Sequence, residues 1–409
     1  MFQDERPGAT TGDFSRSARA GEATASPGFT PSSQRDPRLD FFRGLALFFI
    51  FIDHTDLDVI SRFTLRGFAF CDAAEVFIFI SGVAAAFAYG GVLARRGPLQ
   101  ATARIYRRIW QLYVAHVFVF VAYTALVAFI LNGVHNPAIA RTTGENIFLR
   151  HPGITTAEVL ALGFQPNSFQ ILPLYMVLLA GLPPFLLLIR RHPRVALGLS
   201  AAFYLAEHRF GWTLYLYPDH HPWGFSPLAY QFLFVTGVVC GHLQLSGRRL
   251  LPDRRWIYVV AGAIVAVCAV ISFSHSLQTI SGSFPMLLPG APWSSMDEKR
   301  DLSLLRVVNF LAIAIVVGRL VRRDAKFLSS PLARPVVLCG QNSLHIFCLG
   351  ILLSTAGSYI LQDITDRLRV QLLVAIAGVL LMIGMAFLLT WYKQMGRAGP
   401  SLPARAVAE

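Results

Sequence analysis

The side chains best suited to chemistry lie in one apolar stretch of this sequence. The segment RLDFFRGLALFFIFIDH places Asp40 and Arg43 near its start and Asp53 and His54 at its end. A helix turns about 100° per residue, so the eleven steps from Arg43 to His54 make three turns plus about 20°. These two side chains therefore share one stripe with Asp40, roughly 16 Å apart along the helix axis. Ionisable groups within an apolar span indicate a functional site that faces protein or a wet cavity.

Three carboxylates are candidate partners for His54. Asp53 is adjacent in sequence, but neighbours on a helix point about 100° apart. Asp72 and Glu75 begin the next apolar segment, DAAEVFIFISG, and share one face of the returning helix. A His held by a carboxylate can take a proton from a hydroxyl, as acyl transfer requires. We predict a catalytic set of His54, Glu75, Asp72 and Asp53, with Glu75 orienting the imidazole. The alternative is that His54 makes a structural hydrogen bond between helices.

Arginines gather at the opposite end of the stripe. Arg38 and Arg43 lie on the first apolar segment, and Arg104 and Arg107 begin the third. Guanidinium groups bind phosphates in a bidentate manner, as a nucleotide-bearing acyl donor requires. We predict that these four arginines bind the donor. Anchoring of the chain in the membrane, together with an Asp40–Arg43 pair, is the alternative explanation. Neither a glycine-rich phosphate loop nor a zinc motif is present, so we predict no metal site.

The composition predicts that membrane-spanning helices position these residues. The chain is 54% hydrophobic and only 14% charged, whereas soluble domains carry about 25% charged residues. We predict an all-α fold, a polytopic integral membrane bundle of about ten transmembrane helices. The expected spans are roughly 39–60, 72–92, 104–131, 171–190, 195–207, 228–246, 256–273, 303–321, 336–359 and 369–392.

The positive charge is an orientation signal. The net charge is +13, but the arginines concentrate in alternate short loops, so nucleic acid is not the expected partner. This pattern predicts that both termini are cytoplasmic and that the long loops 132–170, 208–227 and 274–302 face outside. Trp212, Trp223 and Trp293 fall in or beside these loops. They could stack on sugar rings, which would make a glycan the acceptor, or anchor the chain at the membrane interface.

The composition also divides the chain. Residues 1–34 are rich in Gly, Ala, Ser, Thr and Pro and contain no apolar run. We predict that they form a disordered cytoplasmic tail, that residues 35–395 form the transmembrane domain, and that residues 396–409 form a cytoplasmic tail.

Five separated segments resemble a known family. RLDFFRGLALFFIFIDH, DAAEVFIFISG, ILPLYMVLL, LAYQFLFVTGVVCG and GQNSLHIFCLG resemble, in this order, the OpgC family within the wider membrane acyltransferase-3 superfamily. The resemblance covers roughly residues 35–395, and the spacing of Arg43 and His54 matches the superfamily signature. One departure is Gln170, which stands before ILPLY where an acidic residue is expected. A difference there would change the acceptor or its binding.

The resemblance implies an activity and a location. It implies a ten-span protein of the bacterial inner membrane that transfers a succinyl group from succinyl-CoA to osmoregulated periplasmic glucans. His54 would be catalytic and Arg43 would lie on the donor side. The acyl-CoA would be a substrate rather than a bound cofactor, and glucan-synthesis proteins would be candidate partners.

A transporter is the alternative function. Its intramembrane Arg, Asp and His residues would form a path for a substrate or for protons. Many transporters contain inverted repeats, but residues 200–392 hold no second copy of the RGLALFF…DH pattern. This difference favours the enzyme.

Overall fold

The structure is a computed structural model that describes residues 36–55, 59–133, 148, 150–166, 169–218, 220–281 and 299–395. Residues 1–35 and 36–409 form two separate units, and only the second contains described residues. The tails predicted at 1–34 and 396–409 therefore lie outside the described residues.

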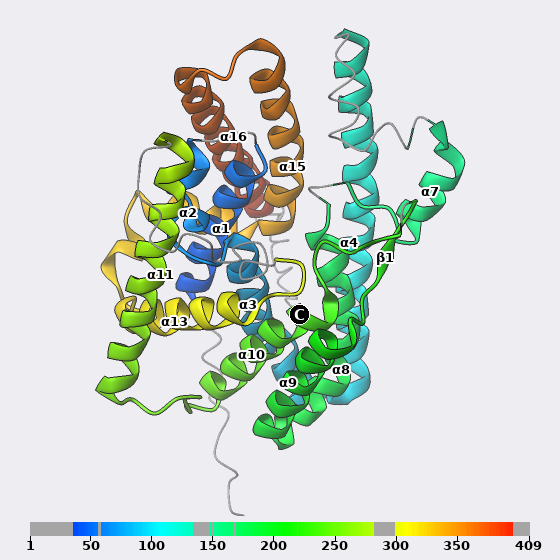
Figure 1. Ribbon diagram of the computed structural model, residues 1–409. Helices are drawn as coiled ribbons and strands as arrows, with labels where there is room; N and C mark the ends of the chain where they lie inside the picture. The colour runs from blue at the N-terminus through cyan, green and yellow to red at the C-terminus, as the bar shows by residue number, and fades with distance from the viewer. Residues whose placement is uncertain are drawn as a thin grey trace, which may run out of the picture. The chain divides into compact units, whose positions relative to one another are not determined.

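The described unit is a bundle of helices, in agreement with the predicted helical fold (Figure 1). Its first half contains α1 (Pro37–Asp53), η1 (Ile60–Phe63), α2 (Leu65–Phe68), α3 (Ala73–Ala85), η2 (Ala86–Gly90), α4 (Gly91–Gly133), α7 (Pro152–Leu160), α8 (Ile171–Arg191) and α9 (Pro193–Phe210). Two short antiparallel strands follow, β1 (Tyr215–Leu216) and β2 (His221–Pro222). The second half contains α10 (Pro227–Leu245), α11 (Arg255–Ser281), α13 (Leu304–Leu320), η3 (Lys326–Ser329), α14 (Ala333–Gln341), α15 (Ser343–Tyr359), η4 (Ile360–Ile364) and α16 (Leu368–Met395).

The helices identify a multi-pass membrane protein. Six described segments are long and apolar enough to cross a membrane: Ala73–Asn132, Ile171–Arg191, Pro227–Leu245, Arg255–His275, Ser343–Gln362 and Leu368–Met395. Helices α1 and α13 have 17 residues each, whereas a typical spanning helix needs about 20. The count of about ten spans and the location of the termini stay predictions.

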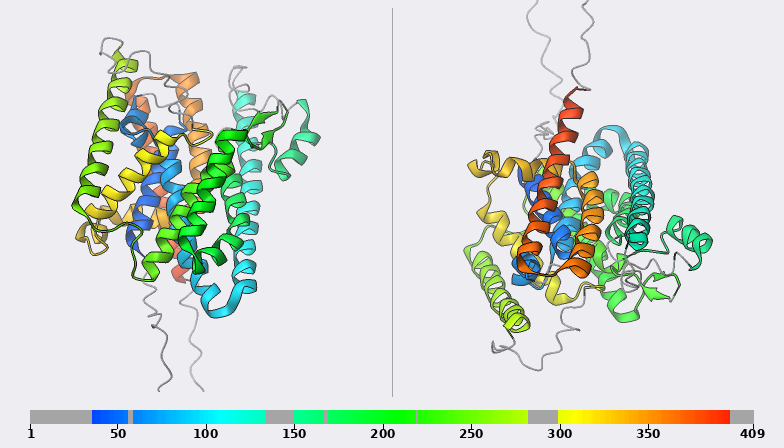
Figure 2. Two further views of the ribbon diagram at one scale, coloured as in Figure 1. Left: turned by 60° about the horizontal axis from the view of Figure 1, so that its bottom comes forward. Right: turned by 90° about the horizontal axis from the view of Figure 1, so that it is seen from above.

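One predicted span differs from the observed helices, and a sharp reversal separates two others. The segment 336–359 is not one helix, because α14 ends at Gln341 and α15 begins at Ser343. The predicted spans 72–92 and 104–131 lie on either side of a reversal at Gly97, which Figure 2 shows at the start of α4. Gly97 has a φ of 83°, a conformation that favours glycine, and Pro98 cannot donate the backbone hydrogen bond that a continuous helix needs.

Glycines allow the central helices to approach closely. Helix α1 contacts α3, α14 and α15. A Cβ atom at Gly340 of α14 would lie 1.8 Å from the carbonyl oxygen of Asp40 in α1. A Cβ at Gly82 of α3 would lie 2.1 Å from the carbonyl oxygen of Phe234 in α10. Small residues at such crossings let helix backbones pack directly against each other, as is common in membrane bundles.

The topology can be tested by labelling introduced cysteines. We predict that a membrane-impermeant maleimide modifies Arg150→Cys in intact cells, because the predicted outer loop 132–170 contains it. Arg96→Cys should react only after the cells are permeabilised, because the positive-inside pattern places this arginine-rich segment in the cytoplasm. Both positions are exposed, so each cysteine is accessible to the reagent on its own side.

The parent chain, whose five cysteines are all buried or half-buried, sets the background. Labelling of Arg96→Cys but not of Arg150→Cys in intact cells would reverse the predicted orientation.

Candidate functional site

The stripe predicted on α1 lies along a row of cavities. Arg43 lines one cavity, and Leu47, Ile50 and His54 line the next. Because these four residues follow the i, i+4, i+7, i+11 spacing, they form one face of the helix. The structure thus confirms that Arg43 and His54 share a stripe that faces open space within the protein.

Three spaces form this row. A basic depression of ≈ 720 Å³ is lined by Arg96, Arg104, Arg107 and Arg108. A middle cavity of ≈ 170 Å³ is lined by Arg43, Arg108, Ser81, Tyr89, Tyr175 and Phe347, among others. A His54 cavity of ≈ 10 Å³, with room for about one water molecule, is lined by Leu47, Ile50, His54, Phe347 and Ser354, among others. Arg108 and Tyr89 line both the basic depression and the middle cavity, and Phe347 lines both the middle cavity and the His54 cavity.

The two shared boundaries have distinct structures. Tyr89 belongs to η2, a single turn of π-helix between α3 and α4. Such π-turns occur frequently at functional sites. At the other boundary the ring of Phe347 stacks on that of Phe77, with 6.3 Å between their centroids. The side chain of Phe347 is therefore the partition between the middle cavity and His54.

The hydrogen bonding of His54 defines its tautomer. Its Nδ1 lies 2.8 Å from the carbonyl oxygen of Ile50, one turn earlier on the same helix. A carbonyl oxygen only accepts hydrogen bonds, so Nδ1 carries a proton and donates it. In the neutral ring Nε2 is then left as the acceptor. Among the described residues, no carboxylate is bonded to this ring, and Nε2 has the chemistry of a base.

The expectation that Glu75 orients His54 is wrong. Glu75 Oε1 accepts a hydrogen bond from Arg306 Nε at 2.8 Å, and Oε2 accepts one from the backbone N–H of Asp72 at 2.9 Å. Within the described part of the chain, no hydrogen bond joins His54 to Glu75 or Asp72. The physical reason is that Glu75 closes a capping box with Asp72 at the start of α3 while it neutralises a buried guanidinium.

The acids belong instead to a largely buried group of charged and polar side chains, which we call the α3 ion cluster: Asp72, Glu75, Lys299, Arg306 and Tyr230. Lys299 Nζ lies 2.7 Å from Asp72 Oδ2, and Arg306 Nη2 lies 2.7 Å from Glu75 Oε1. The Tyr230 hydroxyl donates to the carbonyl oxygen of Lys299 at 2.9 Å. Two carboxylates thus face two cations, which is how buried charges are tolerated.

Sequence reasoning missed three members of this cluster. Lys299, Arg306 and Tyr230 come from segments far from α3 in the chain. A signal was present for one of them, because Arg306 lies inside the predicted apolar span 303–321. An ionisable residue at such a position usually has a buried partner.

Some of the remaining predicted site residues line the row of cavities, and others bond elsewhere. Arg104 and Arg107 line the basic depression, as expected for a cationic entrance. The predicted ion pair of Arg43 is present, with 3.8 Å between Arg43 Nη1 and Asp40 Oδ1, and Arg43 also lines the middle cavity. Asp53 Oδ1 accepts a hydrogen bond from the Thr64 hydroxyl at 2.7 Å rather than orienting its neighbour.

Arg38 does not belong to the row. Its guanidinium bonds to the Asp36 carboxylate and donates to the carbonyl oxygen of Val321 at 3.0 Å, and it lines a different cavity. The reason is helical geometry, since Arg38 is five residues before Arg43 and so lies about 140° around α1 from it.

Gln170, the departure from the expected acid, lies beside the row. It immediately precedes α8, whose first residues Ile171 and Leu172 line the middle cavity. A Cβ at Gly224 would lie 2.2 Å from Gln170 Oε1, so the amide packs directly on the backbone there.

The chain matches a known protein family. Residues 35–394 match the family model described as OpgC protein. No curated protein and no solved structure matches the chain.

The α3 ion cluster gives a prediction about stability. Arg306→Met removes one of two cations facing two buried acids, and losing one partner of a buried pair costs about 3–5 kcal/mol. We therefore expect a clearly lower unfolding temperature in detergent. Adding Glu75→Gln should recover much of the loss, because the charges balance again and the amide oxygen can still accept from Asp72 N–H.

Arg249→Met is the matched control. Arg249 pairs with Asp253 at an exposed site, where an ion pair contributes at most about 1 kcal/mol. An Arg306→Met protein as stable as its parent, or a double variant no better than Arg306→Met, would contradict a structural role for the cluster.

Proposed function

The chain belongs to the OpgC family, and from this premise we propose that it is a membrane O-acyltransferase that transfers a succinyl group from succinyl-CoA to hydroxyls of periplasmic glucans. The family match supports a membrane acyltransferase role and does not favour the transporter alternative. Succinyl-CoA as the donor and periplasmic glucan as the acceptor are the further steps that we propose.

The row of three cavities carries the proposal. In an acyl-CoA, an extended arm separates the phosphates from the reactive thioester. A donor of this shape needs cations at one end of a long path and a base at the other. The basic depression supplies the cations, Arg43 lies midway, and His54 ends the row roughly 16 Å along α1 from Arg43.

Arginines suit the phosphate end of this path. Four guanidinium groups line the basic depression, at Arg96, Arg104, Arg107 and Arg108. Guanidinium forms paired hydrogen bonds with phosphate oxygens and keeps its charge at all relevant pH values. The thioester would then reach His54 past Phe347, whose side chain has to move because the His54 cavity holds only ≈ 10 Å³.

The chemistry at His54 is general-base catalysis. Nε2 removes the proton of an acceptor hydroxyl as its oxygen bonds to the thioester carbon. The carbon–sulfur bond then breaks, and the imidazolium returns the proton to the departing thiolate. The Nδ1–H bond to Ile50 O persists in both protonation states and keeps the ring oriented, since the imidazolium donates from both nitrogens.

Two tryptophans of the predicted outer loops differ in their exposure. Trp212 is 52% exposed and stacks on Phe210, so its face is positioned to meet a sugar, whereas Trp223 is only 5% exposed. Trp293 lies outside the described residues.

Mass spectrometry of periplasmic glucans from cells with and without the chain tests the acceptor and acyl group together. Glucans that carry equal succinyl in both strains would overturn the proposed reaction.

Donor binding gives a prediction for Arg43. Arg43→Lys keeps the charge but replaces a planar fork with a point charge. If Arg43 contacts a donor phosphate, this variant should bind succinyl-CoA at least several-fold more weakly while protein yield is unchanged. Affinity can be measured by calorimetry in detergent. Full affinity in Arg43→Lys together with poor yield of Arg43→Ala would instead assign Arg43 to its pair with Asp40.

Catalysis gives a prediction for His54. General-base catalysis contributes about 10²–10⁴-fold, so His54→Ala should lose at least that factor in succinyl transfer. Expression, unfolding temperature and succinyl-CoA affinity should be retained, because truncation leaves no unpaired buried charge.

Asp53→Asn is the matched control for His54→Ala. Its amide oxygen can still accept from Thr64, so transfer should change much less than in His54→Ala. A well-folded His54→Ala protein that transfers succinyl at nearly the parent rate would leave His54 with a packing role only.

A further inference from the structure

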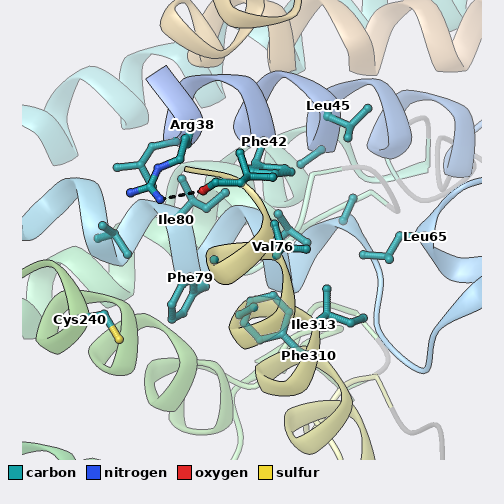
Figure 3. Close-up of a pocket in the computed structure, with 18 of the residues that line it drawn as sticks. Arg38, Phe42, Leu45, Leu65, Val76, Phe79, Ile80, Cys240, Phe310 and Ile313 are labelled. Atoms are coloured by element: carbon teal, nitrogen blue, oxygen red, sulfur yellow. Dashed lines mark hydrogen bonds between the residues drawn. The ribbon is translucent and has the colours of Figure 1, made fainter. Parts of the chain in front are cut away.

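A second large cavity lies on the opposite side of α1 from the row. It has a volume of ≈ 350 Å³ and lies between α1, α3, α10 and α13 (Figure 3). Its α1 residues include Arg38, Phe42, Leu45 and Phe49, which again follow the i, i+4, i+7, i+11 spacing. This stripe lies about 140° around the helix from the stripe of His54. The backbone of α1 therefore separates the two spaces, and we call the second one the apolar cavity.

We propose that the apolar cavity binds an acyl chain of an anionic membrane phospholipid, with the lipid headgroup held by the arginines at its mouth. This inference is independent of the proposed transfer reaction. It rests on the lining, the length and the charge of the cavity.

The interior of the cavity suits a hydrocarbon chain better than the charged succinyl group. Phe42, Phe49, Val76, Phe79, Phe310 and Ile313 are among its lining side chains, and most of the others are also apolar. Apolar cavities of this kind stay dry and take up apolar ligands. A succinyl group ends in a carboxylate, and placing that charge here without a partner would be strongly unfavourable.

The length matches one membrane leaflet. The lining residues of α13 extend from Phe310 to Gly318, eight helical steps or roughly 12 Å, and Val321 lines the cavity just beyond the end of this helix. Those of α3 extend from Ala73 to Val83, roughly 15 Å. Half of the hydrocarbon core of a bilayer is about 15 Å thick, which is the depth that one acyl chain occupies. The cavity opens at the bundle surface, where Gly318 is exposed.

The polar end lies at one extreme of the cavity. Figure 3 shows Arg38 at one end and Leu65 at the other. Asp36 and Gln244 also line the cavity, and Arg323 Nε donates to Asp36 Oδ2 at 2.9 Å. An amphipathic ligand would therefore bind in one orientation, with its polar group beside Arg38 and its chain directed toward Leu65.

The charge at the mouth favours an anion. Burial raises the pKa of Asp36, but hydrogen bonds from Arg38 and Arg323 outweigh it and bring the pKa to about 2. Asp36 is therefore ionised at neutral pH, and two guanidinium groups share one carboxylate, which leaves an excess positive charge. Arg323 is 54% exposed, and its bond to Asp36 uses Nε. Basic sites between membrane helices bind anionic headgroups in this way.

The headgroup of the lipid, rather than its acyl chain, has to make the site prefer one lipid over another. A lipid chain is about as well solvated in the bilayer as in an apolar cavity, so chain burial alone gives little selectivity. One basic residue beside an anionic headgroup raises the affinity for that lipid about fivefold. The affinity for lipid should therefore have one contribution from the acyl chain and one from the charge of the headgroup. Separate variants can remove each contribution.

Native mass spectrometry of the full chain in detergent tests both terms. The probes are phosphatidylglycerol and phosphatidylcholine with identical palmitoyl and oleoyl chains. We expect one bound phosphatidylglycerol and roughly fivefold weaker phosphatidylcholine binding. Gly318→Phe should clearly weaken binding of both lipids, because Gly318 lines the cavity, a Cβ there meets no atom within 4 Å, and the ring can enter the space that the acyl chain needs. Arg323→Gln should retain one lipid but lose the preference for phosphatidylglycerol.

Gly384→Phe on α16 is the matched control. A Cβ at Gly384 also meets no atom within 4 Å, and this residue does not line the cavity. It should bind lipid like the parent. Unchanged lipid binding by Gly318→Phe would overturn the proposal, and so would an unchanged preference in Arg323→Gln. The Arg323→Gln measurement alone still decides the charge term if Gly318→Phe does not fold.

Discussion

Two buried carboxylates at the start of α3 have to be neutralised, and the positions of three helices depend on this requirement. Glu75 is fully buried, and Asp72 caps the helix beside it. An unpaired charge at such a place is strongly unfavourable, so α13 has to present Arg306 to α3. Tyr230 of α10 closes the group through the backbone of Lys299. Charge balance and the close glycine crossing of α3 with α10 thus act on the same helices.

The position of α3 in turn defines the space on both sides of α1. Toward one side, Phe77 and Ser81 of α3 line the middle cavity with Arg43. Toward the other, Val76 and Phe79 of α3 line the apolar cavity. One pair of antiparallel helices therefore contributes walls to a polar path and to an apolar groove. The two spaces differ in chemistry because opposite stripes of the same two helices carry different side chains.

The imidazole of His54 is oriented by a contact within its own helix. A carboxylate beside His54 would have added another buried charge next to Asp72 and Glu75, in a region where every charge needs a partner. The Ile50 carbonyl orients the imidazole without adding net charge. Asp72 and Glu75 are thereby left to hold the fold, and the row of cavities has arginines at one end and the His54 imidazole at the other.

The sequence by itself determined the features that depend on local periodicity and composition. The scarcity of charge predicted a helical membrane protein, and the spacing of Arg43 and His54 placed both on one stripe. Only the tertiary structure decided which groups meet these faces. Arg306, which pairs with Glu75, is 231 residues away in the chain, and Arg38 proved to face a different cavity from Arg43. The physical reason is that helical geometry relates residues within one helix, whereas partners between helices depend on how distant segments pack and balance their charges.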